Sequence, residues 1–301
     1  MRLDLAASRT FGLSRRAARE AVRAGRINVA GATRDEPGLD VPEDAKLSFQ
    51  PDRPTRRRVV TRLTVLAEEA DFLIVDKPAG LLSVPTAERE GDTLLSRTLD
   101  YLHHRYRRRP YAGVVHRLDR ETSGALAFAR SRPALESLQK QFRAHTIARE
   151  YLAIVEGKPP ASGTLDADLV RDGGDRRRSV ARRGERGRRA VTHFRVVEQL
   201  AAAALVSVEL ETGRTHQIRV HFAAAGHPVL GDRVYRRSSP HPAPLEVPRQ
   251  MLHARRLGFS HPSTGAFVEA LSPIPEDFSG ALAALRRLSK DKKNAPRSSR
   301  R

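Results

Sequence analysis

Residues 116–124 read HRLDRETSG, and this stretch decides how the rest of the chain is interpreted. It places five ionisable side chains where an apolar strand passes into a turn that ends in glycine. A carboxylate at such a strand end, here that of Asp119, is placed to project into a cleft. The alternative is structural, because the Asp119 side chain can also cap the turn by accepting hydrogen bonds from the amides of Thr122 or Ser123. On chemistry alone, both interpretations stand.

The sequence on both sides of this stretch mixes strands with helices in irregular order. Apolar runs or alternation predict strands at residues 72–75, 125–129, 151–156 and 206–210, the last of them half-buried. Helical spacing of apolar residues predicts helices at residues 92–102, 133–142 and 215–225. We expect Asp92 to cap the first of these helices and Pro133 to take the first position of the second. This mixture favours an α+β fold over a doubly wound sheet.

The first 50 residues have a basic pattern of their own. Ser14 is expected to cap a helix over residues 15–24, which Gly25 ends and a short strand over residues 26–29 follows. Four arginines accompany the apolar residues of this helix. A phosphate-binding surface is one interpretation of them, and a solvated helix face is the other.

The length of 301 residues is enough for two domains. We divide the chain into a basic module at residues 1–50, a basic linker at 51–62, a main domain at 63–288 and a disordered basic tail at 289–301. The absence of cysteine excludes disulfides, thiol nucleophiles and thiolate metal sites. No stretch is apolar enough for a membrane helix or a signal peptide, so we expect a cytoplasmic protein.

The strongest compositional feature is a formal net charge of +20. Most of this charge lies in three blocks, residues 53–62, 171–189 and 286–301, which carry +5, +6 and +7. Such blocks are typical of solvated segments that bind the phosphates of a nucleic acid. A coding bias that replaces lysine by arginine and enriches surface arginine is the alternative explanation.

The sequence lacks the loops and motifs of nucleotide-driven enzymes, dinucleotide enzymes and common hydrolases. His216 and His221 are five residues apart, which places them on different faces of a helix or a strand. We therefore expect them to be hydrogen-bonding histidines, with no metal site in the protein.

Five motifs in order resemble those of the RluA family of RNA pseudouridine synthases. They are DFLIVDKPAGLL at residues 71–82, HRLDRETSG at 116–124, REYLAIVEG at 149–157, LETGRTHQIRVHFAAAGHPVLGD at 210–232, and LHA at 252–254 with His261-Pro262. Residues 1–50 resemble, more loosely, the S-four-type RNA-binding domain that is often joined to this catalytic domain. The resemblance implies a mixed, largely antiparallel sheet and an enzyme that isomerises uridine in RNA without a cofactor.

The resemblance also implies roles for individual residues. Asp119 matches the family's catalytic aspartate, acting by covalent or by base catalysis, and Arg219 would hold its carboxylate ionised and aimed. Tyr151 matches the active-site tyrosine, which would stack on the uracil, and Leu252 the leucine that walls the pocket; both also suit a core. We expect Arg117 to help fill the space that a flipped uridine leaves or to hold the flipped backbone. The remaining substrate-binding residues expected from the motifs are His116, Thr122, Arg214 and Gln217.

Two departures from the family pattern stand out. Arg149 replaces the lysine that usually precedes the tyrosine segment, which keeps the charge but changes its geometry. Residues 27–31 read INVAG, where such modules usually have a Val-x-Val-Asn-Gly pattern. Neither departure touches Asp119, Tyr151 or Arg219.

The partner that this interpretation requires is a structured RNA, ribosomal or transfer, and the sequence does not select the uridine. The rival class is a non-catalytic RNA-binding or ribosome-assembly protein that keeps this fold. A DNA-binding regulator lacks support, because no pair of helices suits recognition of a major groove. No heptad pattern demands a protein partner, so we expect a monomer.

Overall fold

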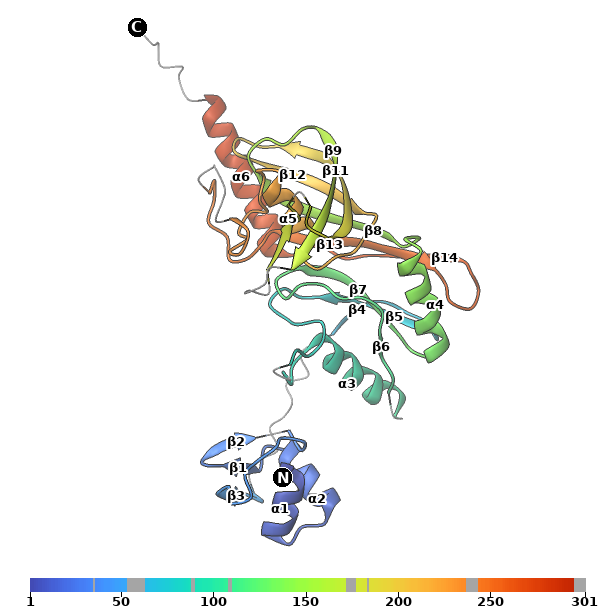
Figure 1. The fold of residues 1–301 in the computed structure, drawn as a ribbon, viewed down its shortest axis with the longest axis vertical. Coiled ribbons are helices and arrows are strands. Elements are labelled where there is room, and N and C mark those ends of the chain that lie inside the picture. Colours follow the sequence, from blue (N-terminus) through green and yellow to red (C-terminus); the bar gives the residue numbers. More distant parts are fainter. Residues whose placement is uncertain are drawn as a thin grey trace. The chain divides into compact units, whose positions relative to one another are not determined.

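The structure is a computed structural model that describes residues 1–34, 36–52, 63–87, 90–107, 110–171, 177–182, 184–236 and 243–294, with side chains up to residue 290. The chain divides into two compact units, Met1–Arg62 and Leu63–Arg301 (Figure 1). Most of the predicted linker at 51–62 lies outside the described residues, and the finer division of the chain stays a prediction. Within the described ranges, no helix is long and apolar enough to cross a membrane.

The N-terminal unit combines two helices with a small antiparallel sheet. Its elements are α1 (Leu3–Phe11), α2 (Arg15–Arg23), β1 (Ile27–Val29), β2 (Ala32–Arg34) and β3 (Leu47–Phe49), and its strand order is β2-β1-β3. As predicted, the Ser14 hydroxyl caps α2 by accepting from the Ala17 amide at 3.1 Å, and Gly25 follows with a φ of +67°. Apolar side chains from both helices and the sheet form one buried cluster, so this unit has its own core.

The main unit is built on one sheet of 11 strands in the described residues. The strands are β4 (Thr64–Glu68), β5 (Phe72–Lys77), β6 (Gly113–Val114), β7 (Ser123–Ala129), β8 (Ala148–Glu156), β9 (Ser162–Arg171), β10 (Arg178–Val180), β11 (Arg188–Gln199), β12 (Ala203–Leu210), β13 (Leu252–Ser260) and β14 (Phe267–Leu271). Their order is β10-β9-β11-β12-β8-β13-β7-β5-β4, while β14 pairs with β13 and β6 with β7. Among the described pairs only β13 with β7 is parallel. The predicted α+β fold with a largely antiparallel sheet is confirmed.

Helices cover both faces of this sheet (Figure 1). They are α3 (Leu94–Tyr106), α4 (Arg132–Arg143), α5 (Gln217–Ala224) and α6 (Glu276–Asn294). In β5, Leu73 and Val75 belong to the apolar cluster that contains residues of α3 and α5. Phe72 and Ile74, which alternate with them, belong to the cluster under α4. Because successive side chains of a strand point to opposite faces, a strand covered on both sides is apolar at every position.

Three local predictions are wrong at their boundaries. Thr93, not Asp92, caps α3, because its hydroxyl accepts from the Ser96 amide at 3.2 Å, whereas the Asp92 carboxylate binds Arg97 at 2.7 Å. The second helix begins one residue earlier than expected, which puts Pro133 at its second position. The third begins later, at Gln217.

Strand β12 is buried on both faces rather than half-buried. Val206 and Val208 are buried as expected, but Ser207 between them is only 7% exposed. Its neighbour Leu205 packs in the cluster that α6 covers, so this helix accounts for the burial of the second face. The Ser207 hydroxyl is satisfied by donating to the Glu150 carboxylate at 2.8 Å.

The predicted disorder after Leu288 is also wrong over six residues, because α6 continues to Asn294. Residues 289–294 read SKDKKN, and lysine is a good helix former that needs no buried face when a helix already runs ahead of it. Residues 295–301 lie outside the described part of the chain.

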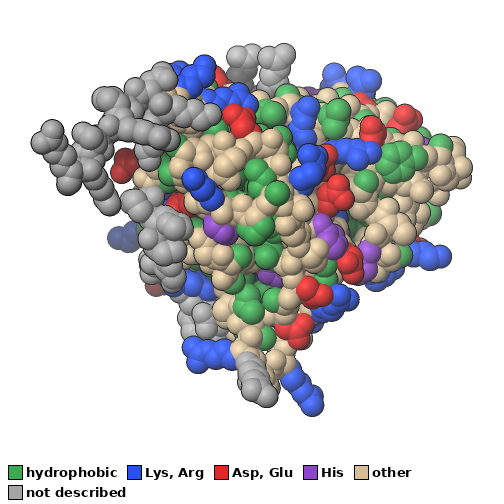
Figure 2. Space-filling model, turned by 90° about the horizontal axis from the view of Figure 1, so that it is seen from above, with side chains coloured by type: hydrophobic (Ala, Val, Ile, Leu, Met, Phe, Trp, Pro, Cys, Tyr) green, Lys and Arg blue, Asp and Glu red, His purple; other side chains and the backbone are tan. Residues whose placement is uncertain are grey.

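The arginine-rich block at 171–189 is not a solvated coil throughout, because β10 and the start of β11 lie within it. Arg188 and Arg189 are exposed strand residues, and Arg189 binds Asp166 on β9 at 2.8 Å. On the face seen in Figure 2, lysine and arginine side chains also lie among acidic ones. Part of the positive charge is therefore balanced locally.

One glycine makes the parallel crossing of β7 and β13 possible. Gly124 pairs with Ala254 and has a φ of +122°. A Cβ at this position would lie 2.6 Å from the Ala254 nitrogen and still closer to its carbonyl oxygen. The backbones of the two strands can therefore approach only at glycine.

We predict that Gly124→Ala destabilises the protein by about 3 kcal/mol or more, because it adds a backbone clash to an unfavourable φ. Urea unfolding monitored by circular dichroism measures the change. Gly265→Ala is the matched control, since Gly265 has a φ of +73° but nothing within 4 Å of its added Cβ. Equal losses of stability in the two variants would contradict the prediction.

Candidate active site

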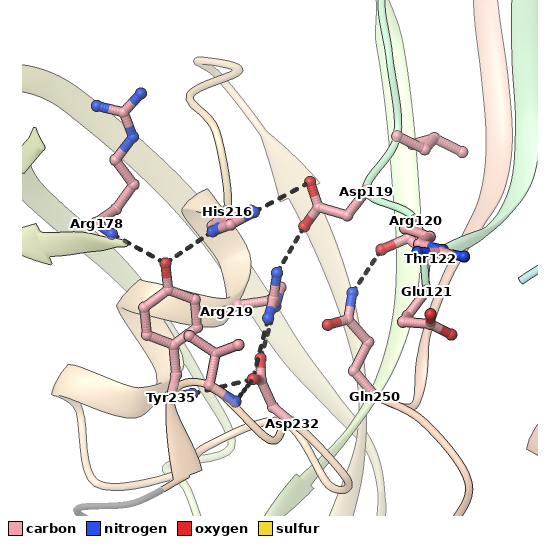
Figure 3. Close-up of polar contacts among 12 residues, drawn as sticks. Asp119, Arg120, Glu121, Thr122, Arg178, His216, Arg219, Asp232, Tyr235 and Gln250 are labelled. Carbon is pink, nitrogen blue, oxygen red and sulfur yellow. Dashed lines mark hydrogen bonds and ion pairs between the residues drawn. The ribbon is translucent and has the colours of Figure 1, made fainter. Parts of the chain in front are cut away.

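Asp119 lies in the loop between β6 and β7, directly after the buried residue Leu118. The Thr122 amide donates to the backbone carbonyl of Asp119 at 3.1 Å, so the turn is closed by the backbone. The carboxylate points to residues of α5 instead (Figure 3). Its side chain is 23% exposed, which leaves it accessible. The capping interpretation of the Asp119 side chain therefore does not hold.

A buried arginine on α5 holds this carboxylate. Arg219 Nη1 donates to Asp119 Oδ2 at 3.1 Å, as the resemblance implies. Its Nε and Nη2 donate to Asp232 at 2.6 and 3.0 Å. Burial by itself would lower the pKa of the Arg219 guanidinium, but the hydrogen bonds and charges of the two aspartates raise it above its ordinary value. Arg219 is therefore a permanent cation beside Asp119.

Asp232 is the residue of this cluster that the sequence analysis missed. Its side chain is fully buried, and its Oδ1 also accepts from the amides of Val234 and Tyr235 at 2.9 and 3.0 Å. A buried arginine does demand a carboxylate partner. Asp232 stands at the end of the fourth motif, but nothing in the sequence distinguishes it from other acidic residues as that partner.

His216 faces the other oxygen of Asp119. Its Nε2 lies 3.8 Å from Asp119 Oδ1, and its Nδ1 lies 2.7 Å from the Tyr235 hydroxyl. That hydroxyl accepts from the backbone amide of Arg178 at 3.0 Å, and the Arg219 guanidinium lies 5.0 Å from the centre of the Tyr235 ring. Burial, as the largest effect, lowers the pKa of His216. The prediction of a hydrogen-bonding histidine describes these contacts, but it missed their proximity to Asp119.

His221 lies elsewhere, buried and in contact with the Thr192 hydroxyl through Nδ1 at 2.9 Å. In the described ranges, no group of three or more potential metal ligands comes together.

The backbone of the Asp119 loop is held by side chains from distant segments. Lys77 Nζ is fully buried and donates to the carbonyls of Arg120 and Thr122 at 2.9 and 2.7 Å, and to Pro78 at 2.9 Å. The Ser83 hydroxyl donates to the Leu118 carbonyl at 2.8 Å. These bonds fix the loop although most loops are mobile.

Side chains from the segment before β13 hold the same loop. Arg249 Nη1 donates to the Glu121 carbonyl at 3.0 Å, and its Nε and Nη2 bind Asp277. Gln250 Nε2 donates to the Thr122 hydroxyl at 2.8 Å (Figure 3). These contacts could not be predicted from the sequence, because they join residues more than 120 positions apart.

Tyr151 and Leu252 lie in one buried apolar cluster with Leu118, the residue before Asp119. Tyr151 is 8% exposed and Leu252 is 4% exposed. Burial raises the pKa of the Tyr151 hydroxyl, and the nearby charge of Asp119 adds to this. Tyr151 thus lies within electrostatic reach of the Asp119 carboxylate, and Leu252 belongs to the same apolar cluster as Tyr151.

The other predicted substrate-binding residues divide into two groups. His116, Thr122 and Gln217 are occupied by the protein: His116 accepts from the Ala127 amide at 3.1 Å, and Gln217 makes four hydrogen bonds to Thr212, Arg214, Val191 and Thr192. The Thr122 hydroxyl accepts from Gln250, and its carbonyl accepts from Lys77. By contrast, Arg117 and Arg214 are exposed. Only the exposed pair stays a proposal for direct RNA contact, and the other three act as supports.

Arg149 supports the approach to α5. Its Nη2 donates to the carbonyls of Leu210 and Glu211 at 3.1 and 3.3 Å. A Cβ on Gly213 would lie 2.7 Å from Arg149 Nη1, so the guanidinium fills the space beside this glycine. The longer, planar side chain that replaces the usual lysine thus holds the turn that precedes His216.

We predict a pH-dependent stability effect for Lys77→Met. Burial lowers the pKa of the folded Lys77 to about 7, from 10.5. Between these values the unfolded chain binds more protons at Lys77 than the folded chain, so the wild type gains stability relative to Lys77→Met as the pH rises. Urea midpoints at pH 7, 8 and 9 measure this difference.

Lys140→Met, at an exposed position on α4, is the control and should differ from the wild type by the same amount at each pH. A difference between wild type and Lys77→Met that stays constant over this range would refute the prediction.

Comparisons with known proteins point to one enzyme family. Residues 71–224 match the RNA pseudouridylate synthase family. The ribosomal large subunit pseudouridine synthase D of Nitrosomonas europaea is 41% identical over 230 residues, which are 75% of this chain and 66% of that protein. An uncharacterized RNA pseudouridine synthase of Mycobacterium bovis is 36% identical over 299 residues, 95% and 94% of the two chains.

Solved structures give the same fold. The human RNA pseudouridylate synthase domain containing 4 protein has a TM-score of 0.62 at 24% identity, covering 74% of this chain and 93% of that one. The human RNA pseudouridylate synthase domain containing 1 protein has a TM-score of 0.57 at 26% identity, covering 75% of this chain and 96% of that one. With the family match over half of its length, the chain therefore belongs to the RluA family of RNA pseudouridine synthases, which are isomerases.

Proposed function

We propose that this protein isomerises uridine to pseudouridine in large-subunit ribosomal RNA, with Asp119 as the catalytic carboxylate. The observation that carries this proposal is the Asp119 carboxylate itself, which is partly exposed, bound through Oδ2 to the buried cation Arg219, and adjacent to an apolar cluster that contains Tyr151. The RNA is inferred from relatives such as the synthase D proteins of Nitrosomonas europaea and Zymomonas mobilis, whose names specify the ribosomal large subunit. Transfer RNA is the alternative substrate.

The reaction needs only groups that this site contains. Isomerisation breaks the bond from ribose C1′ to uracil N1, forms a bond from C1′ to C5, releases the proton of C5 to solvent and adds one proton at N1. Asp119 Oδ1, which Arg219 does not bind, is the oxygen that would act as nucleophile or as base. Tyr151 would stack on the uracil, and Leu252 would keep water from the detached sugar.

A uridine within folded RNA must leave its stack to reach Asp119, at a cost of a few kcal/mol. Arg117, exposed and two residues before Asp119, would hold the flipped nucleotide or fill its place. The arginine block at 171–189 would bind flanking phosphates. Its position supports this role, because the Arg178 amide is hydrogen-bonded to Tyr235 of the site.

The rival function is RNA binding without catalysis. A pure RNA binder has no physical use for a carboxylate oriented by a buried arginine that a second, fully buried aspartate neutralises. The arrangement of Asp119 and Arg219 therefore favours the enzyme.

We predict that Asp119→Asn lowers turnover by about a thousandfold or more, because the amide can act neither as nucleophile nor as base. The assay is release of tritium from unmodified large-subunit ribosomal RNA transcribed in vitro with [5-³H]uridine. Asp166→Asn, which removes an exposed carboxylate paired with Arg189, is the control and should keep wild-type turnover. Tritium release by Asp119→Asn within tenfold of the wild-type rate would overturn the proposal in favour of RNA binding alone.

A second prediction concerns the arginine block. Arg186→Ala/Arg188→Ala removes two exposed cations, so the slope of log Kd against log salt concentration should fall by about two, with kcat at saturating RNA unchanged. Filter binding at several salt concentrations measures the slope.

The matched control is Arg132→Ala/Arg143→Ala on α4, which packs on β7 away from the β10 end of the sheet. An unaltered slope for Arg186→Ala/Arg188→Ala, or an equal decrease in both double variants, would argue against a specific phosphate contact at residues 171–189.

A further inference from the structure

The two oxygens of the Asp119 carboxylate have different environments. Oδ2 accepts from Arg219 at 3.1 Å, whereas Oδ1 lies 3.8 Å from His216 Nε2 (Figure 3). The latter distance is too long for a hydrogen bond but short enough for a strong electrostatic interaction in a partly buried site. A hydrogen on His216 Nε2 therefore acts on Oδ1, the oxygen that Arg219 does not bind.

The contact with the Tyr235 hydroxyl favours one tautomer of His216. The Arg178 amide already donates to this hydroxyl at 3.0 Å, and a phenol has one proton to give. His216 Nδ1, at 2.7 Å, is positioned to accept that proton. The neutral ring then carries its hydrogen on Nε2, directed at Asp119.

Burial supports the neutral form of both rings. Burial, the leading effect for each, lowers the pKa of His216 and raises the pKa of Tyr235, although the charge of Asp119 acts in the opposite direction on His216. The other charged groups acting on His216 are Arg219 of α5, Asp232 of the following turn and Arg178 of β10. The cations lower the pKa of His216 and the anions raise it.

The backbone of His216 gives an independent indication. This residue has a φ of +60° at the start of α5, and it makes no capping hydrogen bond with its side chain there. A residue other than glycine or asparagine in this conformation costs about 1 kcal/mol or more. Such strain persists only where the surrounding structure holds the residue in place.

We propose that His216, fixed in one tautomer by Tyr235, is a positioning residue that orients the reactive oxygen of Asp119. The Nε2–H group attracts Oδ1 and sets the plane of the carboxylate, while Arg219 retains Oδ2. Because the separation stays above hydrogen-bonding distance, Oδ1 keeps its reactivity toward the substrate. This inference rests on the proposed catalytic role of Asp119.

The test compares two substitutions that each keep one end of the imidazole. His216→Asn places its amide near the former Nδ1, tolerates the positive φ, and loses the group that faces Asp119. His216→Gln reaches the position of Nε2 and keeps an N–H donor there. We expect kcat for tritium release to fall about tenfold to a hundredfold in His216→Asn, with KM nearly unchanged, and to recover to within about threefold of the wild type in His216→Gln.

A double-mutant cycle tests whether Tyr235 acts through His216. Tyr235→Phe keeps the ring under Arg219 and removes only the hydroxyl, so kcat should fall about threefold to tenfold. In the His216→Asn background the same change should have no further effect on kcat. Tyr101→Phe is the control. It removes a hydroxyl bound to Glu68 on β4, the strand at the opposite end of the sheet from β10, and should leave kcat at the wild-type value.

Three results would overturn the inference: wild-type kcat in His216→Asn, a His216→Gln variant as slow as His216→Asn, or full additivity of the His216 and Tyr235 changes. Thermal unfolding of each variant identifies loss of fold, and if His216→Asn does not fold, the comparison of Tyr235→Phe with Tyr101→Phe decides. Asp119→Asn is assayed in parallel. An active Asp119→Asn removes the proposed function, whereas an inactive Asp119→Asn beside a fully active His216→Asn removes only this inference.

Discussion

The site depends on one cation shared by two carboxylates. Arg219 is nearly buried and binds Asp232 through two nitrogens and Asp119 through the third. A buried charge left without a partner is far more costly than the pair is stabilising. Arg219 and Asp232 must therefore be placed together, and the position of Asp119 follows from them. The ion pairs of Arg219 thus connect α5 with the turn at residues 232–235 and with the β6–β7 loop.

These ion pairs would have little effect if the loop that carries Asp119 could move. The loop is held by its backbone oxygens, which accept from Lys77, Ser83 and Arg249. These three donors come from segments that are far apart in the sequence, so the loop acquires its shape only when the whole sheet is assembled. A carboxylate held at both its backbone and one oxygen loses little freedom on binding substrate, which is the physical basis of preorganised catalysis.

The parts of the molecule that could be predicted are those with a local signal. The apolar runs of β5, β7 and β8, the helix that Ser14 caps and the α+β class all follow from spacing within a few residues. The burial of Ser207 could not be predicted, since α6 supplies the covering side chains from some 70 residues away. The arginines of β11 obscure the apolar–polar alternation of this long strand, so its pattern could not be recognised in the sequence either.

The same distinction explains the site. The Asp119–Arg219 contact follows from the family resemblance, which carries long-range information that composition and periodicity lack. Asp232 and the relation of His216 to Asp119 depend on which side chains meet after folding, and so does the use of Gln217 as a support rather than a ligand. Sequence motifs identify a group of residues as functional, but hydrogen-bond accounting in the structure is needed to separate those that can still bind substrate from those already saturated.

The buried arginines near Asp119 are engaged within the protein, since Arg219 is balanced by two carboxylates and Arg249 by Asp277. Arg117, two residues before Asp119, is instead exposed. An unpaired buried cation at this point would bind Oδ1, the oxygen that the proposed reaction needs. The arginines of residues 171–189 reach the site through β10, where the Arg178 amide binds the Tyr235 hydroxyl and Val180 packs with Tyr235 and Val220. A protein that must attract a polyanion and also use an anionic catalyst needs the buried cations nearest the catalyst to be paired within the protein, because an unpaired one would bind the group that acts on the RNA.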